Sequence, residues 1–126
     1  MILPLLVLTA ALSEPAFVRV KGADVERLPW NDYLARVVEQ EAGPGFPIQA
    51  LRAQAVVART YALHRIERAR SQGGSYDVEA GTFGQALSGG PASAASREAV
   101  EDSRGLVLMV DGRPLEAFFH ASCGGR

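Results

Sequence analysis

Apolar residues recur at helical spacing over residues 30–41 and predict a first helix there. Leu34, Val37 and Val38 form its apolar stripe, and a Gly-Pro-Gly sequence ends it. The next position on the stripe is Glu41, where another aliphatic residue would be expected. A carboxyl group held there would lose water, which raises its pKa toward the range that a general acid needs. The alternative is that the helix end frays and Glu41 simply reaches solvent.

A second, longer helix is predicted from residue 47 to about residue 72, before a Gly-Gly pair. Small side chains dominate its apolar side, so another backbone can approach closely. These apolar positions include Leu51, Ala55, Ala58 and Ala62. Gln54, Arg59 and Thr60 are polar within this apolar stretch; taken alone, Arg59 most often pairs with an acid or snorkels to solvent. The charged far end, residues 65–70, is expected to face solvent.

Short strands are predicted on both sides of the two helices. They cover residues 17–20, 25–28, 76–78 and 83–87, and a short helix capped by Ser93 covers residues 93–102. Two further runs, 106–110 and 115–119, flank Asp111-Gly112, which fits a two-residue type I′ hairpin turn. This order of elements predicts one α+β domain with two consecutive helices, short strands and a C-terminal β-hairpin.

The first thirteen residues have a character of their own. Residues 2–12 resemble the apolar core of an export signal, and Thr9-Ala10-Ala11 offers a small-residue cleavage site. The run is too short to cross a bilayer as a helix, and no Lys or Arg precedes Arg19. We therefore expect residues 1–13 to direct export to the cell envelope, periplasm or exterior. The alternative is a buried N-terminal strand or helix.

Composition removes several classes of function. The 126 residues carry a formal net charge of −1, so no strong field draws the chain to nucleic acid. Cys123 is the single cysteine, which excludes an internal disulfide and a zinc site built mainly from cysteine. The sequence has no glycine-rich phosphate loop and no paired-cysteine metal motif. We expect no cofactor.

Three groups of residues carry candidate chemistry. They are Glu41 with the polar residues of the second helix, His120 with Ser122 and Cys123, and the loop around Asp77 and Gln85. A Cys123/His120 nucleophile pair is conceivable. However, two residues three apart in an extended or turning segment do not by themselves bring thiol to imidazole, and a reactive thiol needs a nearby cation or helix N-terminus. The Cys123/His120 pair is therefore not preferred, and Glu41 and the loop around Asp77 and Gln85 remain candidates.

Several motifs follow one another in a specific order. They are Leu28-Pro29-Trp30-Asn31-Asp32-Tyr33-Leu34, then Val37-Val38 and Glu41, then the stretch from Ala50 to Ala62, then Tyr76-Asp77-Val78 and Gln85, and last Ala117-Phe118-Phe119-His120 with Ser122 and Gly124-Gly125. This series resembles the SpoIID/LytB family, and the resemblance covers roughly residues 17–126. The stretch Ala50–Ala62, which contains Gln54, Arg59 and Tyr61, is similar to the most specific part of that family.

The resemblance implies a bacterial lytic transglycosylase that acts on peptidoglycan glycan strands. Such enzymes cleave between N-acetylmuramic acid and N-acetylglucosamine and leave a 1,6-anhydro end. Glu41 matches the catalytic glutamate of the family and would act as both acid and base, so Glu39, which points to another helix face, is not needed as a partner. The resemblance also implies substrate-binding roles for matched motif residues. We assign these to Gln54, Arg59, Tyr61, Gln85, His120 and Ser122.

The sequence departs from the family pattern in two places. Some members bind zinc through Cys and His residues in the loop after Tyr-Asp-Val, and this loop has neither, so no metal is expected. The chain stops after Gly124-Gly125, where the family normally continues, so we expect a truncated C-terminus. An alternative function also remains open. Some relatives are called amidase enhancers, which would make the protein a non-catalytic glycan-binding partner of a cell-wall amidase.

Overall fold

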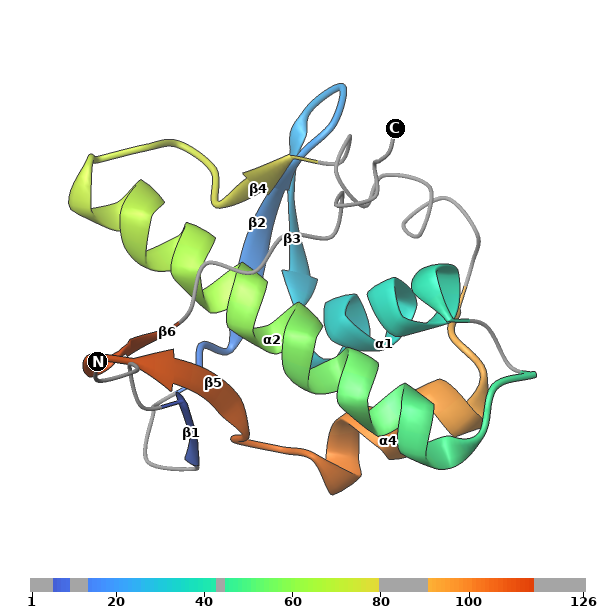
Figure 1. The fold of residues 1–126 in the computed structure, drawn as a ribbon. Helices are drawn as coiled ribbons and strands as arrows, with labels where there is room; N and C mark the ends of the chain where they lie inside the picture. Colours follow the sequence, from blue (N-terminus) through green and yellow to red (C-terminus); the bar gives the residue numbers. More distant parts are fainter. Residues whose placement is uncertain (1–5, 10–13, 43–44, 80–90, 115–126) are drawn as a thin grey trace, which may run out of the picture.

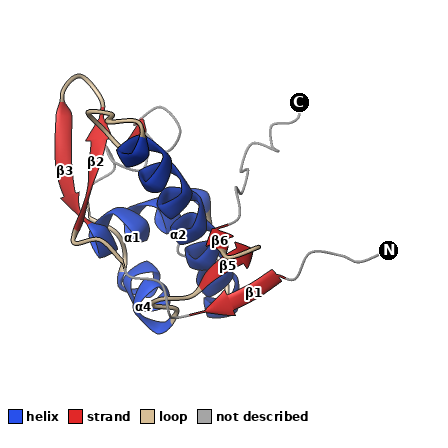
Figure 2. Cartoon of the chain, turned by 90° about the vertical axis from the view of Figure 1, so that its left-hand side faces the viewer, coloured by secondary structure: helices blue, strands red, loops and turns tan. Residues whose placement is uncertain are grey.

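Two small sheets flank the helices in a computed structural model that describes residues 6–9, 14–42, 45–79 and 91–114 (Figures 1 and 2). The first sheet has the order β3-β2-β4 and the second the order β1-β5-β6. The elements are β1 (Leu6–Thr9), β2 (Phe17–Lys21), β3 (Val25–Pro29), α1 (Trp30–Glu41), α2 (Ile48–Ser71), β4 (Val78–Glu79), α4 (Ala94–Asp102), β5 (Val107–Val110) and β6 (Arg113–Pro114). The predicted single α+β domain with two consecutive helices is confirmed.

The helices form where the sequence predicts them. α1 covers residues 30–41 as expected, α2 is one residue shorter than predicted at each end, and α4 begins one residue later than predicted. Ser93 caps α4 as predicted, because its hydroxyl accepts a hydrogen bond from the Ser96 N–H at 3.3 Å. Among the described residues, no helix is long and apolar enough to cross a membrane.

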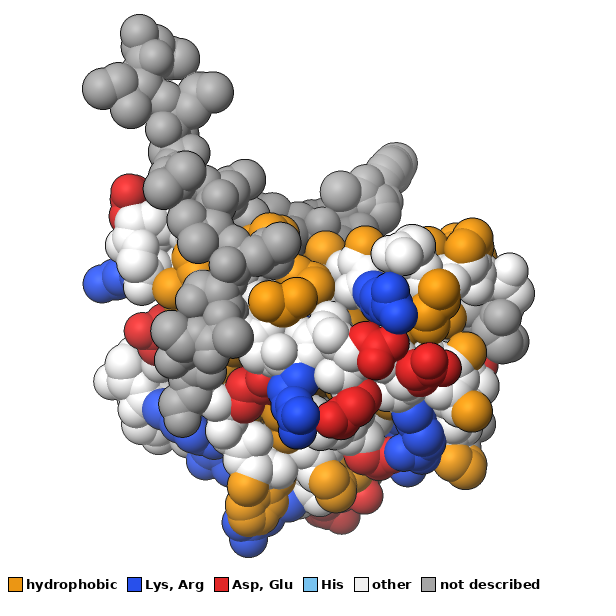
Figure 3. Space-filling view, turned by 90° about the horizontal axis from the view of Figure 1, so that it is seen from below, with side chains coloured by type: hydrophobic (Ala, Val, Ile, Leu, Met, Phe, Trp, Pro, Cys, Tyr) orange, Lys and Arg blue, Asp and Glu red, His pale blue; other side chains and the backbone are white. Residues whose placement is uncertain are grey.

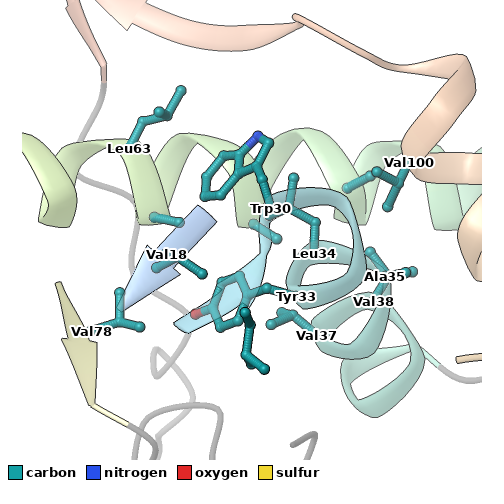
Figure 4. Close-up of a cluster of buried hydrophobic side chains, with 14 of the residues drawn as sticks. Val18, Trp30, Tyr33, Leu34, Ala35, Val37, Val38, Leu63, Val78 and Val100 are labelled. Carbon is teal, nitrogen blue, oxygen red and sulfur yellow. The ribbon is translucent and has the colours of Figure 1, made fainter. Parts of the chain in front are cut away.

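The core lies where α1, α2 and the β3-β2-β4 sheet meet. Figure 4 shows Tyr33, Leu34 and Val37 of α1 grouped with Val18 of β2 and Val78 of β4. Three alanines on one face of α2 are fully buried, since Ala55, Ala58 and Ala62 are at most 1% exposed. Small side chains on this face therefore allow neighbouring elements to pack closely on α2, as the sequence predicts. α1 and α4 also pack on α2 along this region.

Strand pairing completes the two sheets. β2 pairs antiparallel with β3 and parallel with β4, so the chain must pass through both helices before it returns to the sheet at Val78. The predicted strand at residues 76–78 is shifted, because only Val78 and Glu79 pair. Asp77 holds this crossover together, since its buried carboxylate accepts hydrogen bonds from the Arg19 N–H and from the Arg19 guanidinium, both at 2.9 Å.

The second sheet contains the hairpin predicted from Asp111-Gly112. These two residues have φ values of 53° and 79°, as a type I′ turn requires. The second strand was predicted at residues 115–119, but pairing already begins at Arg113 opposite Val110. After a two-residue turn the second strand begins at the very next residue, Arg113, so the predicted start at residue 115 was too late. Residues 115–119, like the predicted strand at 83–87, lie outside the described residues.

Residues 6–9 of the N-terminal segment form a strand. β1 pairs antiparallel with β5 from Leu6 opposite Val110 to Thr9 opposite Val107. Export directed by residues 1–13 stays a prediction. The same sheet is fastened to α2 by Thr60, whose hydroxyl accepts from the Leu108 N–H at 2.9 Å and donates to the Val56 carbonyl at 2.7 Å.

Candidate active site

The C-terminal turn of α1 carries two glutamates in different environments. The buried face of α1 ends at Val38, and the helix itself ends at Glu41, where the Ala42 N–H still donates to the Val38 carbonyl at 2.9 Å. Glu39 and Glu41 are two residues apart and therefore project from different sides of the helix. Their surroundings give the two carboxyl groups opposite chemical characters.

Glu39 is tied to the start of α4. Its Oε1 accepts hydrogen bonds from the Ser93 N–H at 3.1 Å, the Ser93 hydroxyl at 2.7 Å and the Ser96 hydroxyl at 2.7 Å. These bonds stabilise the ionised form, so the pKa of Glu39 lies below its usual value, chiefly because of the bonds from Ser93 and Ser96. Glu39 therefore serves as a fixed carboxylate that joins α1 to α4.

The pKa of Glu41 is shifted in the opposite direction from that of Glu39. Burial raises the pKa of its carboxyl, although the residue as a whole is exposed. Water still reaches the side chain, so its desolvation is partial. Within the described part of the chain, no hydrogen bond or ion pair holds its carboxyl group. The sequence placed Glu41 on the buried apolar stripe, and this is corrected. The stripe stops at Val38 because α1 runs beyond the core at its last turn.

A row of polar side chains follows one face of α2. Gln54, Tyr61, Arg65 and Arg68 are separated by seven, four and three residues, which aligns them along a helix. Gln54 and Tyr61 are half-buried, and Tyr61 packs partly against the core. Of the predicted substrate-binding residues, these two therefore share an accessible face. Arg65 and Arg68 extend that face and were predicted only as a solvated helix end. Their helical spacing from Tyr61 was the signal that could have identified them.

Arg59 does not belong to this accessible row. It is fully buried, and its guanidinium donates to the carbonyl oxygens of Ser103, Val100 and Leu106 at 2.8, 3.1 and 3.1 Å. Its Nε also lies 3.3 Å from Glu14 Oε1. Burial lowers the pKa of Arg59, and the Glu14 carboxylate partly offsets this. Every bond described here points into the protein and gives Arg59 a structural role, and its predicted contact with sugar stays a prediction.

The other predicted site residues have different outcomes. Gln85, His120 and Ser122 lie outside the described residues, as does Cys123. Asp77 was a candidate because of its loop, but its carboxylate is bound by Arg19 and fastens β4 to β2. Among the described residues, no three His, Cys, Asp or Glu side chains come together in a group that could hold a metal ion.

Described residues line three surface hollows along the second half of α2. The largest, about 490 Å³, is lined by Arg65 and Arg68 from α2 and by Tyr76 and Asp77 from the segment before β4. The other two are bounded by α2 and the β5-β6 hairpin, with Pro114 in both. Glu41 lines none of these three. The polar row on α2 leads into the largest hollow through Arg65.

Fold and site together define a small α+β domain in which one helix ends in two unlike glutamates and the next helix carries a row of polar side chains. A family model described as "Stage II sporulation protein" matches residues 19–110. The chain belongs to this SpoIID family. The matched range contains Glu41, Gln54 and Tyr61 and ends before His120.

A curated relative adds little functional information. An uncharacterized protein of Brachyspira hyodysenteriae is 35% identical over 102 residues. The alignment covers 80% of this chain and 27% of the relative, so the chain spans about a quarter of that protein's length. No solved structure matches the chain.

Proposed function

We propose that this SpoIID protein has a cell-wall role and acts as a lytic transglycosylase, with Glu41 as its general acid and base. The proposal depends on one observation: the pKa values of two neighbouring glutamates are shifted in opposite directions. Bonds from Ser93 and Ser96 keep Glu39 ionised, whereas burial raises the pKa of Glu41. Pairs of titratable groups whose environments separate their pKa values are typical of acid and base assignments in active sites.

The reaction needs only one such group. Protonated Glu41 would give its proton to the glycosidic oxygen as the bond from C1 of N-acetylmuramic acid to that oxygen breaks. The ionised carboxylate would then take the proton of the sugar's own 6-hydroxyl while O6 bonds to C1. This closes the 1,6-anhydro ring and returns Glu41 to its protonated form. Because the attacking hydroxyl belongs to the substrate, no second carboxylate is required to activate water.

The glycan strand would lie along the polar face of α2. Gln54 and Tyr61 offer an amide and a phenol that can bind sugar hydroxyl and acetamide groups. Gln85, His120 and Ser122 stay proposed substrate contacts on the basis of the family resemblance. Such a substrate also requires the protein to reach the wall, which is consistent with the proposed export.

Glu41→Gln tests the assignment. The amide cannot donate the acidic proton, so anhydro-ended products should disappear from digests of purified glycan strands analysed by mass spectrometry. Glu98→Gln is a matched control, because Glu98 is an exposed glutamate on α4. Circular dichroism should show that both variants fold. If folded Glu41→Gln releases anhydro products at the wild-type rate, the catalytic assignment is wrong.

A second function is favoured by one observation. Glu41 is exposed and lines none of the three hollows, whereas the polar row of α2 runs into the largest. A domain that binds glycan through α2 and stimulates an amidase would need no catalytic Glu41. It predicts glycan binding without anhydro products, and faster amidase turnover on addition of the protein. Wild-type and Glu41→Gln proteins would then stimulate the amidase equally.

A further inference from the structure

Two arginines of α2 face the largest hollow. Arg65 and Arg68 lie three residues apart on α2, so both side chains reach the same side of the helix. Among the described residues, no ion pair joins either guanidinium to an acid. Other arginines near the hollow differ, since Arg19 and Arg70 both lie against Asp77. Two adjacent cations repel each other, so a bound anion would stabilise the pair.

The remaining groups around the hollow allow an anion to enter. Asp77 also lines it, but this carboxylate is completely buried and accepts from Arg19 through both oxygens. Tyr76 donates its hydroxyl to Glu79 at 2.8 Å, and the Lys21 ammonium lies 5.9 Å from the Tyr76 ring. Glu79 therefore accepts a hydrogen bond from Tyr76, and Lys21 adds a positive charge beside the same ring. Arg65 and Arg68 are the cationic donors that line the hollow.

The hollow is also continuous with the proposed glycan-binding face. Gln54 and Arg68 are fourteen residues apart on one side of α2, a span of about 21 Å. Burial chiefly raises the pKa of the Tyr33 hydroxyl, while Tyr61 also raises it and Arg65 lowers it, which indicates that both groups lie near this phenol. A polymer that contacts Gln54 and Tyr61 would therefore reach the arginines next.

We propose that Arg65 and Arg68 form a carboxylate-binding subsite that anchors the wall glycan at this end of α2. Guanidinium groups bind carboxylates through paired, charge-assisted hydrogen bonds, and two on one helix face can hold one such group from both sides. Wall glycan offers two sources of this chemistry: the lactyl carboxylate of peptide-free muramic acid, and the carboxylates of attached peptides. The subsite deepens the proposed function and rests on it for the identity of the polymer.

Binding should be measured in the catalytically silent Glu41→Gln background, so that cleavage does not remove the ligand. Three probes are needed: peptide-stripped glycan, peptide-bearing glycan, and stripped glycan whose carboxyl groups have been reduced to alcohols. The test variant is Arg65→Gln/Arg68→Gln. The matched control is Arg27→Gln/Arg104→Gln, which removes two exposed arginines whose contacts are the Phe17 ring and Glu101.

The test variant should bind the preferred carboxylate-bearing probe about tenfold more weakly, whereas the control changes by less than about twofold. Reduced glycan should bind the parent protein as weakly as it binds the test variant. The probe that shows the larger loss identifies the carboxylate source. Equal binding of parent and test variant to both carboxylate-bearing probes, or undiminished binding of reduced glycan, overturns the subsite.

The proposed reaction is checked separately. Anhydro products are measured with wild-type protein and with Arg65→Gln/Arg68→Gln in an otherwise wild-type chain. If Arg65→Gln/Arg68→Gln loses carboxylate-dependent binding and the wild type releases no anhydro product, the subsite is supported and the catalytic role is rejected. If both proteins release anhydro product and binding does not depend on carboxylates, the catalytic role is supported and the subsite is rejected.

Discussion

The carboxylate of Glu39 lies 2.7 Å from the hydroxyl of Ser96, a residue that is completely buried. Through this bond and those from Ser93, the last turn of α1 is attached to the first turn of α4. The same attachment distinguishes Glu39 from Glu41, because it stabilises charge on one glutamate only. The last turn of α1 therefore carries both a glutamate that joins two helices and the glutamate proposed as the catalytic acid.

We predict that Glu39→Ala destabilises the domain by about 1–3 kcal/mol at pH 7, since buried donors lose their acceptor. The pKa of Glu39 is lowered on folding, so its contribution is complete above the unfolded pKa of about 4.3 and is lost as the pH falls through the folded value. Urea unfolding at several pH values measures this. The difference from wild type should shrink in acid, whereas Glu98→Ala should change stability little at any pH.

Glu41 should show itself in the pH dependence of cleavage. Its raised pKa keeps the acid form populated to higher pH than an ordinary glutamate allows. The descending limb of kcat/KM for anhydro-product release should therefore lie above the usual glutamate pKa of about 4.3. Rates measured across the pH range on stripped glycan provide the profile. A rate that stays constant through this range would argue against a titrating carboxylic acid.

Folding stability provides an independent check on Glu41. Because its folded pKa is raised, its effect on stability is most favourable below the unfolded pKa and becomes less so as the pH rises through the folded value. Glu41→Gln should then be at least as stable as wild type at pH 7. Thermal unfolding of both proteins tests this. A marked destabilisation would mean that the ionised carboxylate has a structural partner.

We predict that the main role of Arg59 is to stabilise the fold, and not to bind glycan. Arg59→Met removes the donors to three backbone carbonyls and leaves Glu14 without its guanidinium partner, so we expect a loss of about 3–5 kcal/mol. Urea unfolding gives the value, with Arg104→Met as an exposed control. Unchanged stability together with weakened glycan binding would support the sugar-contacting role.

The hairpin turn depends on Gly112. Its φ of 79° disfavours any residue with a Cβ, so Gly112→Ala should destabilise the domain by about 1 kcal/mol. Gly45→Ala is a matched control, because an added Cβ at Gly45 meets no atom within 4 Å and its φ is not in the left-handed region. Thermal unfolding should separate the two. Equal effects would show that the turn geometry is not responsible.

Charge on the visible surface agrees with the modest net charge. In Figure 3, basic and acidic side chains alternate across the described part of this face. Many charges of the described chain are paired locally, as Arg36 is with Asp32 and Arg52 with Asp102. Arg65 and Arg68, which have no ion pair among the described residues, are therefore informative because of their local setting, and not because of an overall basic field.

Local signals in the chain were sufficient to place the helices and the turn. Periodic apolar residues, Ser93 and Asp111-Gly112 act over a few neighbouring positions, so the sequence alone determines where α1, α2, α4 and the type I′ turn form. Glu41 and the polar residues of α2 could be picked out as candidate site residues for the same reason, because each interrupts a local apolar pattern.

Long-range packing decided the rest. β1 pairs with β5 across about a hundred residues, and Arg59 finds its partners in α4 and the segment beyond it, contacts that no local pattern encodes. Exposure of Glu41 and burial of Arg59 depend on where neighbouring elements end in space. For that reason the sequence could name both as polar residues in a specific motif, but only the fold separated the surface acid from the interior cation.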